Sequence, residues 1–129
     1  MKNTIIKEVI QRTGGAPVVL HGYDLEALER ARKMIETLAP IWPTVEAICQ
    51  EVGINEFKFK VGFKHLFGVT PFDYHMQLKM EAAQKMLRDH GHSVGRVAEL
   101  QGYRHVGSFC REFKKVFGTS PGHFKRYEE

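Results

Sequence analysis

Residues 44–68 read TVEAICQEVGINEFKFKVGFKHLFG, and residues 93–118 repeat their pattern as SVGRVAELQGYRHVGSFCREFKKVFG. At an offset of 49 residues, Val45, Ile48 and Gly53 recur as Val94, Val97 and Gly102. After this glycine the offset is 50, and Phe59, Phe63, Lys64, Phe67, Gly68 and Pro71 recur as Phe109, Phe113, Lys114, Phe117, Gly118 and Pro121. Chance seldom aligns so many glycines and phenylalanines in one order, so the pattern indicates an internal repeat.

Each copy of the repeat carries the signals of two short helices joined by a tight turn. A hydroxyl N-cap opens the first helix, a glycine turns the chain, two aromatics four apart mark the buried face of the second helix, and another glycine ends it. In the first copy these residues are Thr44, Gly53, Phe59, Phe63 and Gly68. In the second copy they are Ser93, Gly102, Phe109, Phe113 and Gly118. Such a unit is a helix-turn-helix.

Helical signals also connect and flank the two copies. Residues 71–89 contain no internal breaker and predict one long helix, which at ~1.5 Å per residue would span about 28 Å. Asp24 is a suitable N-cap for an earlier helix, and a proline at the first helical position favours a last helix over 121–127. Residues 1–23 resemble a linker, or the tail of an N-terminal region missing from this chain. The sequence thus predicts an all-α fold of about seven helices, with two homeodomain-like helix-turn-helix subdomains (44–68 and 93–118) in one domain over 24–129.

Composition limits the class of protein to which the chain can belong, but it does not identify a function. The chain has 129 residues, 43% of them hydrophobic, and a net charge of +4, which is too mild to identify a partner by itself. No stretch approaches the ~20 apolar residues of a membrane span or the pattern of a signal peptide. Two cysteines without CxxC spacing, Cys49 and Cys110, favour a reducing, cytoplasmic compartment. We expect no membrane association.

Catalytic and metal-binding patterns are weak. His90 and His92 have no cysteine or carboxylate at convincing ligand spacing, so a surface loop is a better interpretation than a zinc site. The sequence contains no nucleophile paired with a base and no glycine-rich phosphate loop. We therefore expect neither a cofactor nor a metal, and no enzymatic activity.

Residues 44–127 resemble the AraC/XylS family of bacterial transcription regulators. The resemblance rests on VEAICQEVGINEFKFKVGFKHLFGVTPFDYH and, above all, on VAELQGYRHVGSFCREFKKVFGTSPGHFKRY. The run KFKVGFKHLFG is similar to the subgroup of that family with siderophore-related regulators. The resemblance implies that the second helix of each copy, roughly 56–66 and 105–116, enters a major groove of DNA. Successive major-groove faces lie about 34 Å apart, a distance comparable with the length of the predicted connecting helix.

Individual residues take roles through this resemblance. The arginine that reads bases in the second motif matches Arg111, whereas Val61 occupies the corresponding place in the first. Arg111 lies two positions before Phe113, so it points outward if the phenylalanine faces the core. The base-reading candidates are Phe57, Lys58, Lys60, Val61, His105, Gly107, Ser108 and Arg111. The phosphate-binding candidates are Lys64, Arg104, Lys114, Lys115, Lys125 and Arg126.

The partners implied are double-stranded DNA, RNA polymerase, and an effector-binding or dimerisation domain that this chain lacks. Activation of transcription is the tendency of the family. Because Val61, Val106 and Gly107 replace polar readers, an alternative is a helical protein-interaction module that has lost specific DNA binding. A regulator fused to alkyl-transfer chemistry is a third class, but neither cysteine has a reactive context.

Overall fold

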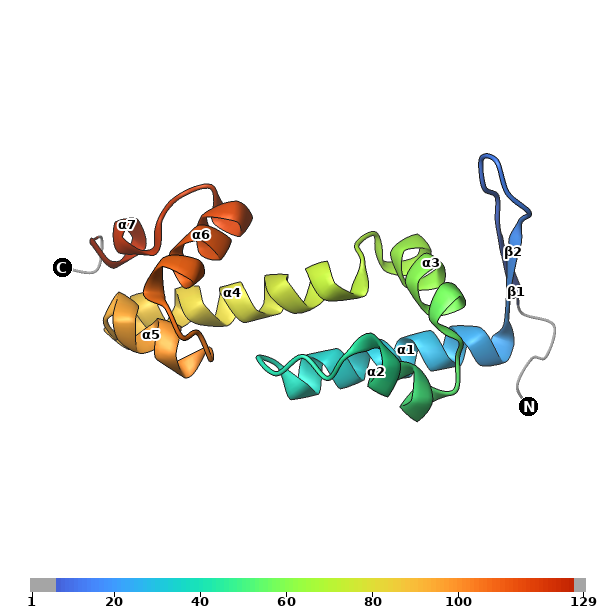
Figure 1. The fold of residues 1–129 in the computed structure, drawn as a ribbon, viewed down its shortest axis with the longest axis horizontal. Helices are drawn as coiled ribbons and strands as arrows, with labels where there is room; N and C mark the ends of the chain where they lie inside the picture. Colours follow the sequence, from blue (N-terminus) through green and yellow to red (C-terminus); the bar gives the residue numbers. More distant parts are fainter. Residues whose placement is uncertain (1–6, 127–129) are drawn as a thin grey trace. The chain divides into compact units, whose positions relative to one another are not determined.

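The computed structural model describes residues 7–126 and divides the chain into two compact units between Tyr74 and His75. The described residues form two strands and seven helices (Figure 1): β1 (Lys7–Ile10), β2 (Val18–His21), α1 (Gly22–Leu38), α2 (Val45–Val52), α3 (Glu56–Phe67), α4 (Pro71–Asp89), α5 (Val94–Leu100), α6 (Val106–Phe117) and α7 (Pro121–Arg126). The prediction of a mainly helical fold with about seven helices is confirmed.

The N-terminal segment differs from the linker that the sequence suggested. β1 and β2 pair antiparallel, with Lys7 opposite His21 and Ile10 opposite Val18. The connecting loop turns through Gly14, whose φ of 75° suits glycine. The hairpin is ordered because one face of β2 is buried against α1 and α3. Residues 1–6 of the expected linker lie outside the described residues.

Helix α1 begins three residues earlier than the sequence predicted, because its N-cap is His21 and not Asp24. Asp24 is not the N-cap but the third helical residue, and its Oδ2 accepts a hydrogen bond from the His21 backbone N–H at 2.9 Å. A carboxylate in the first helical turn satisfies a free donor there and complements the helix dipole. The helix ends at Leu38, just before the Ala39–Pro40 peptide bond.

The first helix-turn-helix has the caps that the sequence predicted at Thr44 and Gly53, and a further N-cap at Asn55. The Thr44 hydroxyl accepts a hydrogen bond from the Ala47 N–H at 3.1 Å, and Gly53 ends α2 at a φ of 75°. Asn55 caps α3 by accepting from the Lys58 N–H at 2.8 Å. Since each cap satisfies backbone groups that the helix leaves unpaired, the boundaries are set locally.

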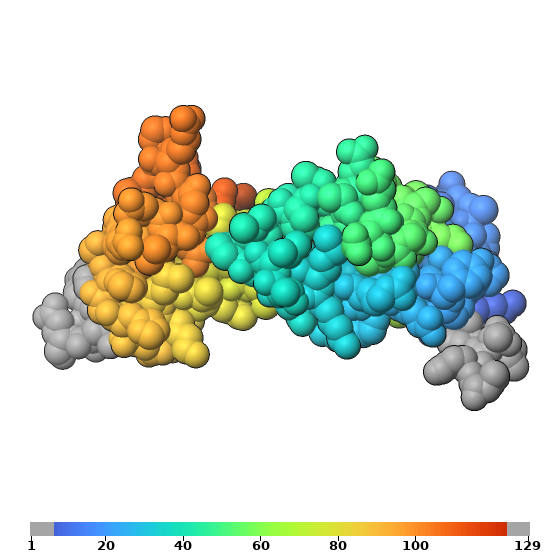
Figure 2. Space-filling view, turned by 90° about the horizontal axis from the view of Figure 1, so that it is seen from below, coloured from blue at the N-terminus to red at the C-terminus, as the bar shows by residue number. Residues whose placement is uncertain are grey.

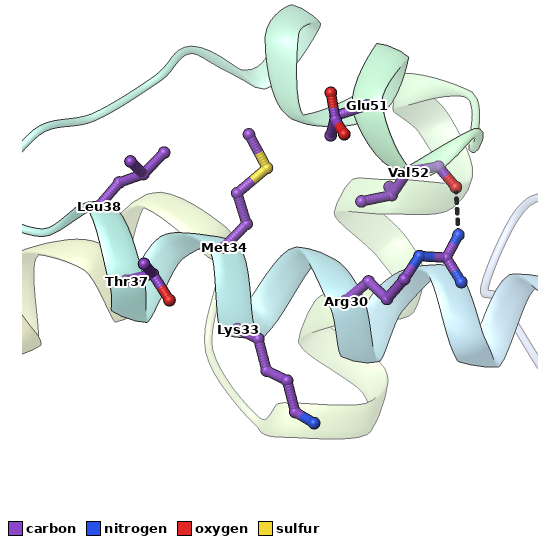
Figure 3. A pocket seen from close by; sticks show the side chains of 7 residues that line it. All are labelled: Arg30, Lys33, Met34, Thr37, Leu38, Glu51 and Val52. Atoms are coloured by element: carbon purple, nitrogen blue, oxygen red, sulfur yellow. Dashed lines mark hydrogen bonds between the residues drawn. The ribbon is translucent and has the colours of Figure 1, made fainter.

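The core of the first unit joins α1, α2, α3 and the hairpin. Its fully buried side chains include Leu20, Leu28, Ile35, Ile48, Phe59 and Phe63. The side chains of α1 (cyan) and α2 (teal) pack against each other on the face shown in Figure 2. Arg30 of α1 extends this packing by donating from Nη2 to the Val52 carbonyl oxygen at the end of α2, at 2.8 Å (Figure 3).

The second unit is built on the greater part of α4, which has the bounds predicted for the connecting helix. Its core contains Met80, Ala83, Leu87, Val97, Ala98, Phe109 and Phe113. Ser93 caps α5 by accepting from the Arg96 N–H at 3.1 Å, and Gly118 ends α6 in the left-handed conformation. No helix within residues 7–126 is long and apolar enough to cross a lipid bilayer.

Candidate nucleic-acid interface

Helix α3 exposes a basic and aromatic face on the side opposite its core residues. Its buried side is formed by Phe59, Gly62 and Phe63. At 100° per residue, the opposite side carries Phe57, Val61 and Lys64, with Lys60 beside them. Phe57 is 49% exposed, the two lysines are exposed, and Val61 is half-buried. Four of the sequence-predicted residues therefore share one accessible helix face.

Lys58 does not belong to that face. Its Nζ lies 2.9 Å from Oδ2 of Asp24, and its side chain retains only 25% of its exposure. The Asp24 carboxylate is buried at 5% exposure, so removal of Lys58 would leave a buried charge without its ion-pair partner. The sequence-based role of Lys58 as a base reader does not fit this geometry, because its ammonium group already joins α3 to the first turn of α1.

Helix α6 presents Arg111 on an open surface in the second unit. Ser108, Arg111, Glu112, Lys114 and Lys115 line a shallow hollow along this helix. Arg111 donates from Nη2 to the Ser108 hydroxyl oxygen at 3.2 Å, which orients the guanidinium along the helix. A Cβ built on Gly107 would meet only Arg111 Nη1, at 3.5 Å, so this part of the surface is flat and accessible.

A hydrogen bond between a tyrosine and a carboxylate fixes one side of α6. The Tyr103 hydroxyl donates to Glu112 Oε1, and Lys79 of α4 lies with its Nζ 4.1 Å from the centre of the Tyr103 ring. Burial, and then the Glu112 carboxylate, raise the pKa of Tyr103, so the phenol remains protonated at neutral pH. Glu112 therefore accepts from Tyr103 and makes no ion pair with Arg111 within the described part of the chain.

The remaining candidates lie around the second motif. Arg104 and His105 are exposed in the turn before α6, and His105 is the N-cap residue of that helix without a side-chain cap bond. Lys114 and Lys115 are exposed in its last turn. Lys125 and Arg126 fall on α7, in a segment whose side chains lie outside those that the structure describes. The first and second motifs thus each gather basic residues on the exposed side of one helix.

The thiol of Cys49 shows no sign of nucleophilic activation. Cys49 is buried in α2, and burial raises the pKa of its thiol, with Glu56 adding to the effect. A thiol that stays protonated at neutral pH is a poor nucleophile. No group of three or more histidine, cysteine, aspartate or glutamate side chains that could hold a metal ion occurs in residues 7–126.

A separate apolar groove lies between α1 and α2 in the first unit. Figure 3 shows Met34 and Leu38 pointing toward α2, whereas Lys33 points away from it. Glu51 and Val52 form the opposite wall, and no residue of α3 lines the groove. The groove is therefore distinct from the basic face of α3.

One cation near α3 was not among the sequence-based candidates. The guanidinium carbon of Arg12, in the hairpin loop, lies 5.0 Å from the centre of the Phe57 ring. Arg12 lies in the segment 1–23 that the sequence analysis treated as a linker or tail, and no local pattern there indicates which helix the loop reaches.

The arrangement of two helix-turn-helix motifs is shared with a known protein family. A family model described as "Helix-turn-helix domain" matches residues 48–127, which cover both motifs. The chain belongs to the AraC-type helix-turn-helix family. The MmsAB operon regulatory protein of Pseudomonas aeruginosa is 35% identical over 107 residues, a match that covers 83% of this chain and 31% of that protein. The chain spans less than a third of the length of the first curated relatives that it matches.

Solved structures share the fold at lower identity. A probable AraC family regulator from Rhodopseudomonas palustris is similar with a TM-score of 0.71 and 21% identity, covering 81% of this chain and 98% of that one. The DNA-binding domain of AdpA, solved in complex with a target DNA, is similar with a TM-score of 0.63 and 21% identity, covering 80% and 89% of the two chains. The AraC-type fold is therefore observed over most of this chain.

Proposed function

We propose that this AraC-type chain binds a specific site on double-stranded DNA and regulates transcription from it. The observation that carries the proposal is the exposed face of α6, where Arg111 lies beside Ser108, Lys114 and Lys115. A planar guanidinium can donate two parallel hydrogen bonds to O6 and N7 of guanine, which distinguishes this base in the major groove. The target DNA named for the AdpA structure supports a nucleic-acid role for this fold.

In this proposal both second helices, α3 and α6, enter successive major grooves. Support comes from the repeat itself and from the single helix α4, whose 19 residues correspond to about 28 Å of helix. His105, Gly107 and Ser108 join Arg111 as base-contacting candidates in the second groove. Phe57, Lys60 and Val61 occupy the same role in the first.

In this proposal, the two motifs differ in how well they distinguish one base sequence from another. The apolar side chains Phe57 and Val61 can contact only thymine methyl groups or sugars, whereas Arg111 can read guanine. Lysines act as point charges that bind phosphates and hold the register of the protein without reading sequence. Lys64, Arg104, Lys114, Lys115, Lys125 and Arg126 complete this set of proposed phosphate contacts.

Further partners are proposed from the family. Since the chain spans less than a third of its first relatives, we propose that an effector-binding or dimerisation domain acts with it. RNA polymerase is the proposed partner for activation in the cytoplasm, and activation is the proposed direction of regulation. The likeness of the α3 segment to siderophore-related regulators remains a narrower proposal from sequence.

Selection of bound sequences from random DNA, followed by equilibrium binding, tests the proposal. Arg111→Ala should relax preference at one base pair, with a loss of discrimination of about 1–3 kcal/mol, and leave binding to random DNA much less affected. Lys115→Ala is the matched control on the same helix, because loss of a phosphate contact weakens all sequences alike. Equal losses on selected and random DNA for Arg111→Ala would refute base reading. Absence of any selected sequence, together with a tight protein partner, would instead favour the protein-interaction module.

A further inference from the structure

Both strands of the β1–β2 hairpin contact helix α3. Leu20 of β2 is fully buried, and a Cβ added to Gly62 of α3 would lie 3.2 Å from its Cδ1 atom, so helix and strand approach closely there. On β1, Glu8, the cross-strand partner of Leu20, has its Oε1 3.4 Å from Nε2 of His65. The hairpin therefore has a defined place beside the proposed recognition helix of the first motif (Figure 1).

The loop of this hairpin holds an arginine at the N-terminal end of α3. The guanidinium of Arg12 lies over the exposed ring of Phe57, with 5.0 Å between its Cζ and the ring centre. On its other side it rests against Gly15, where an added Cβ would come within 3.0 Å of Arg12 Nη1. Nη1 also donates to the Ala16 carbonyl oxygen at 3.5 Å. These contacts orient the group while the residue stays exposed.

The position of Arg12 matters because the first motif has no arginine on α3. Val61 occupies the place of Arg111, and Lys58 is engaged with Asp24. Phe57 lies in the first turn of α3, and the N-terminal residues of a recognition helix are those that enter a major groove most deeply. A cation that flanks this turn from outside the helix faces the sugar-phosphate wall of the groove rather than the base edges.

We propose that the hairpin is a wing of the first DNA-binding motif and that Arg12 binds a backbone phosphate bordering the first groove. The proposal rests on the DNA-binding function proposed above. Phe57 supports the guanidinium of Arg12 through a cation–π contact. Gly15 has no side chain, so the guanidinium can lie close to the loop. The wing adds affinity and fixes the approach of α3, but it carries no sequence information.

The salt dependence of DNA binding tests the wing. For the unmodified chain, Arg12→Ala and Arg12→Lys, dissociation constants for the selected site and for random DNA are measured by fluorescence anisotropy over a range of salt concentrations. Arg12→Ala should make the slope of log K against log salt shallower by about 0.9, and should weaken both DNAs by the same factor. Arg12→Lys should keep most of the slope. Lys7→Ala is the control, because Lys7 is an exposed cation at the opposite end of the same hairpin.

Three results with the variants would overturn the proposal. One is an unchanged slope in Arg12→Ala, and another is an equal change in Lys7→Ala. The third is a loss of discrimination at a single base pair, which would make Arg12 a base reader. If the unmodified chain binds DNA without sequence preference, the specific function fails, yet the Arg12 slope can still be measured on random DNA. No binding to any DNA would overturn both proposals.

Discussion

Replacement of Gly62 by alanine tests the packing between the hairpin and α3. Gly62 lies in the middle of α3, where glycine is ordinarily a poor choice, and its φ is not in the left-handed region. An added Cβ would come within 2.8 Å of Leu28 Cδ1 and within 3.2 and 3.3 Å of the two Cδ atoms of Leu20. Leu20 and Leu28 are fully buried, so neither has free space into which it can move.

Two opposing effects decide the sign of the change. Alanine gains about 1 kcal/mol over glycine within a helix. Overfilling a tightly packed core costs about 1–3 kcal/mol, because side chains or backbone must shift. With three contacts below ordinary van der Waals separation and two immobile leucines, we expect the packing cost to exceed the helix gain. The expected net loss is about 1 kcal/mol, which lowers the melting temperature of a unit of this size by about 4–8 °C.

Thermal and urea unfolding followed by circular dichroism measures this change. Gly95→Ala is the control, because a Cβ at that position of α5 would meet nothing within 4 Å and should stabilise by up to about 1 kcal/mol. The two glycine-to-alanine substitutions should therefore shift stability in opposite directions. A Gly62→Ala variant that is as stable as Gly95→Ala would show that α3 is not tightly packed against Leu20 of the hairpin and Leu28 of α1.

Three further substitutions test features of the two units. Thr44 has a φ of 82° and a ψ of 148°, a backbone conformation suited to glycine. Thr44→Gly should therefore raise the free energy of unfolding in urea by about 1 kcal/mol despite the lost cap. A lower free energy of unfolding would refute the backbone strain at Thr44. Both side-chain polar atoms of the buried Gln101 find no hydrogen-bond partner among the described residues. Gln101→Leu should therefore raise the free energy of unfolding by about 1–2 kcal/mol. The control Gln50→Leu, at an exposed position, should not. Burial, and then Lys79, lower the pKa of His75, so its neutral form is favoured in the folded protein and stability should fall below about pH 6.5, by at most ~1.4 kcal/mol per pH unit. His75→Gln should flatten this acid limb in unfolding curves, and an unchanged limb would exclude His75 as its source.

Apart from the start of α1, the helix boundaries named in the sequence analysis were predictable because their signals are local. Thr44 and Ser93 cap the helices that follow them, and Gly53, Gly68 and Gly118 end helices in the left-handed conformation. Each signal acts through backbone groups within about four residues, so a single sequence contains all the information required. The bounds of α4 follow from the same kind of evidence, a proline at its first position and no breaker before Asp89.

The parts that the sequence did not predict depend on contacts between distant residues. Hairpin residue Leu20 is buried against Gly62, 42 positions later in the chain, and Lys58 pairs with Asp24 across 34 positions. A four-residue strand such as Lys7–Ile10, of which only Ile10 is buried, is marginal without such support. The sequence therefore placed Lys58 together with Lys60 among the base-reading candidates, and only the tertiary structure separates the two. The roles of the exposed residues on DNA stay predictions.

The differences between the two copies of the repeat have a common structural basis. At the offset of 50, Gly62 corresponds to Glu112 and Val61 to Arg111. In the second unit Glu112 of α6 accepts a hydrogen bond from Tyr103, while in the first unit Gly62 of α3 leaves room for Leu28 of α1 and Leu20 of the hairpin. The hairpin that packs beside Gly62 also carries Arg12 to the exposed end of α3. The first motif thus has an arginine on a neighbouring element rather than on the helix, so this surface has a guanidinium although position 61 is a valine. On this argument, Arg12→Ala should affect DNA binding by the first motif more than any substitution of Val61 by another small apolar residue.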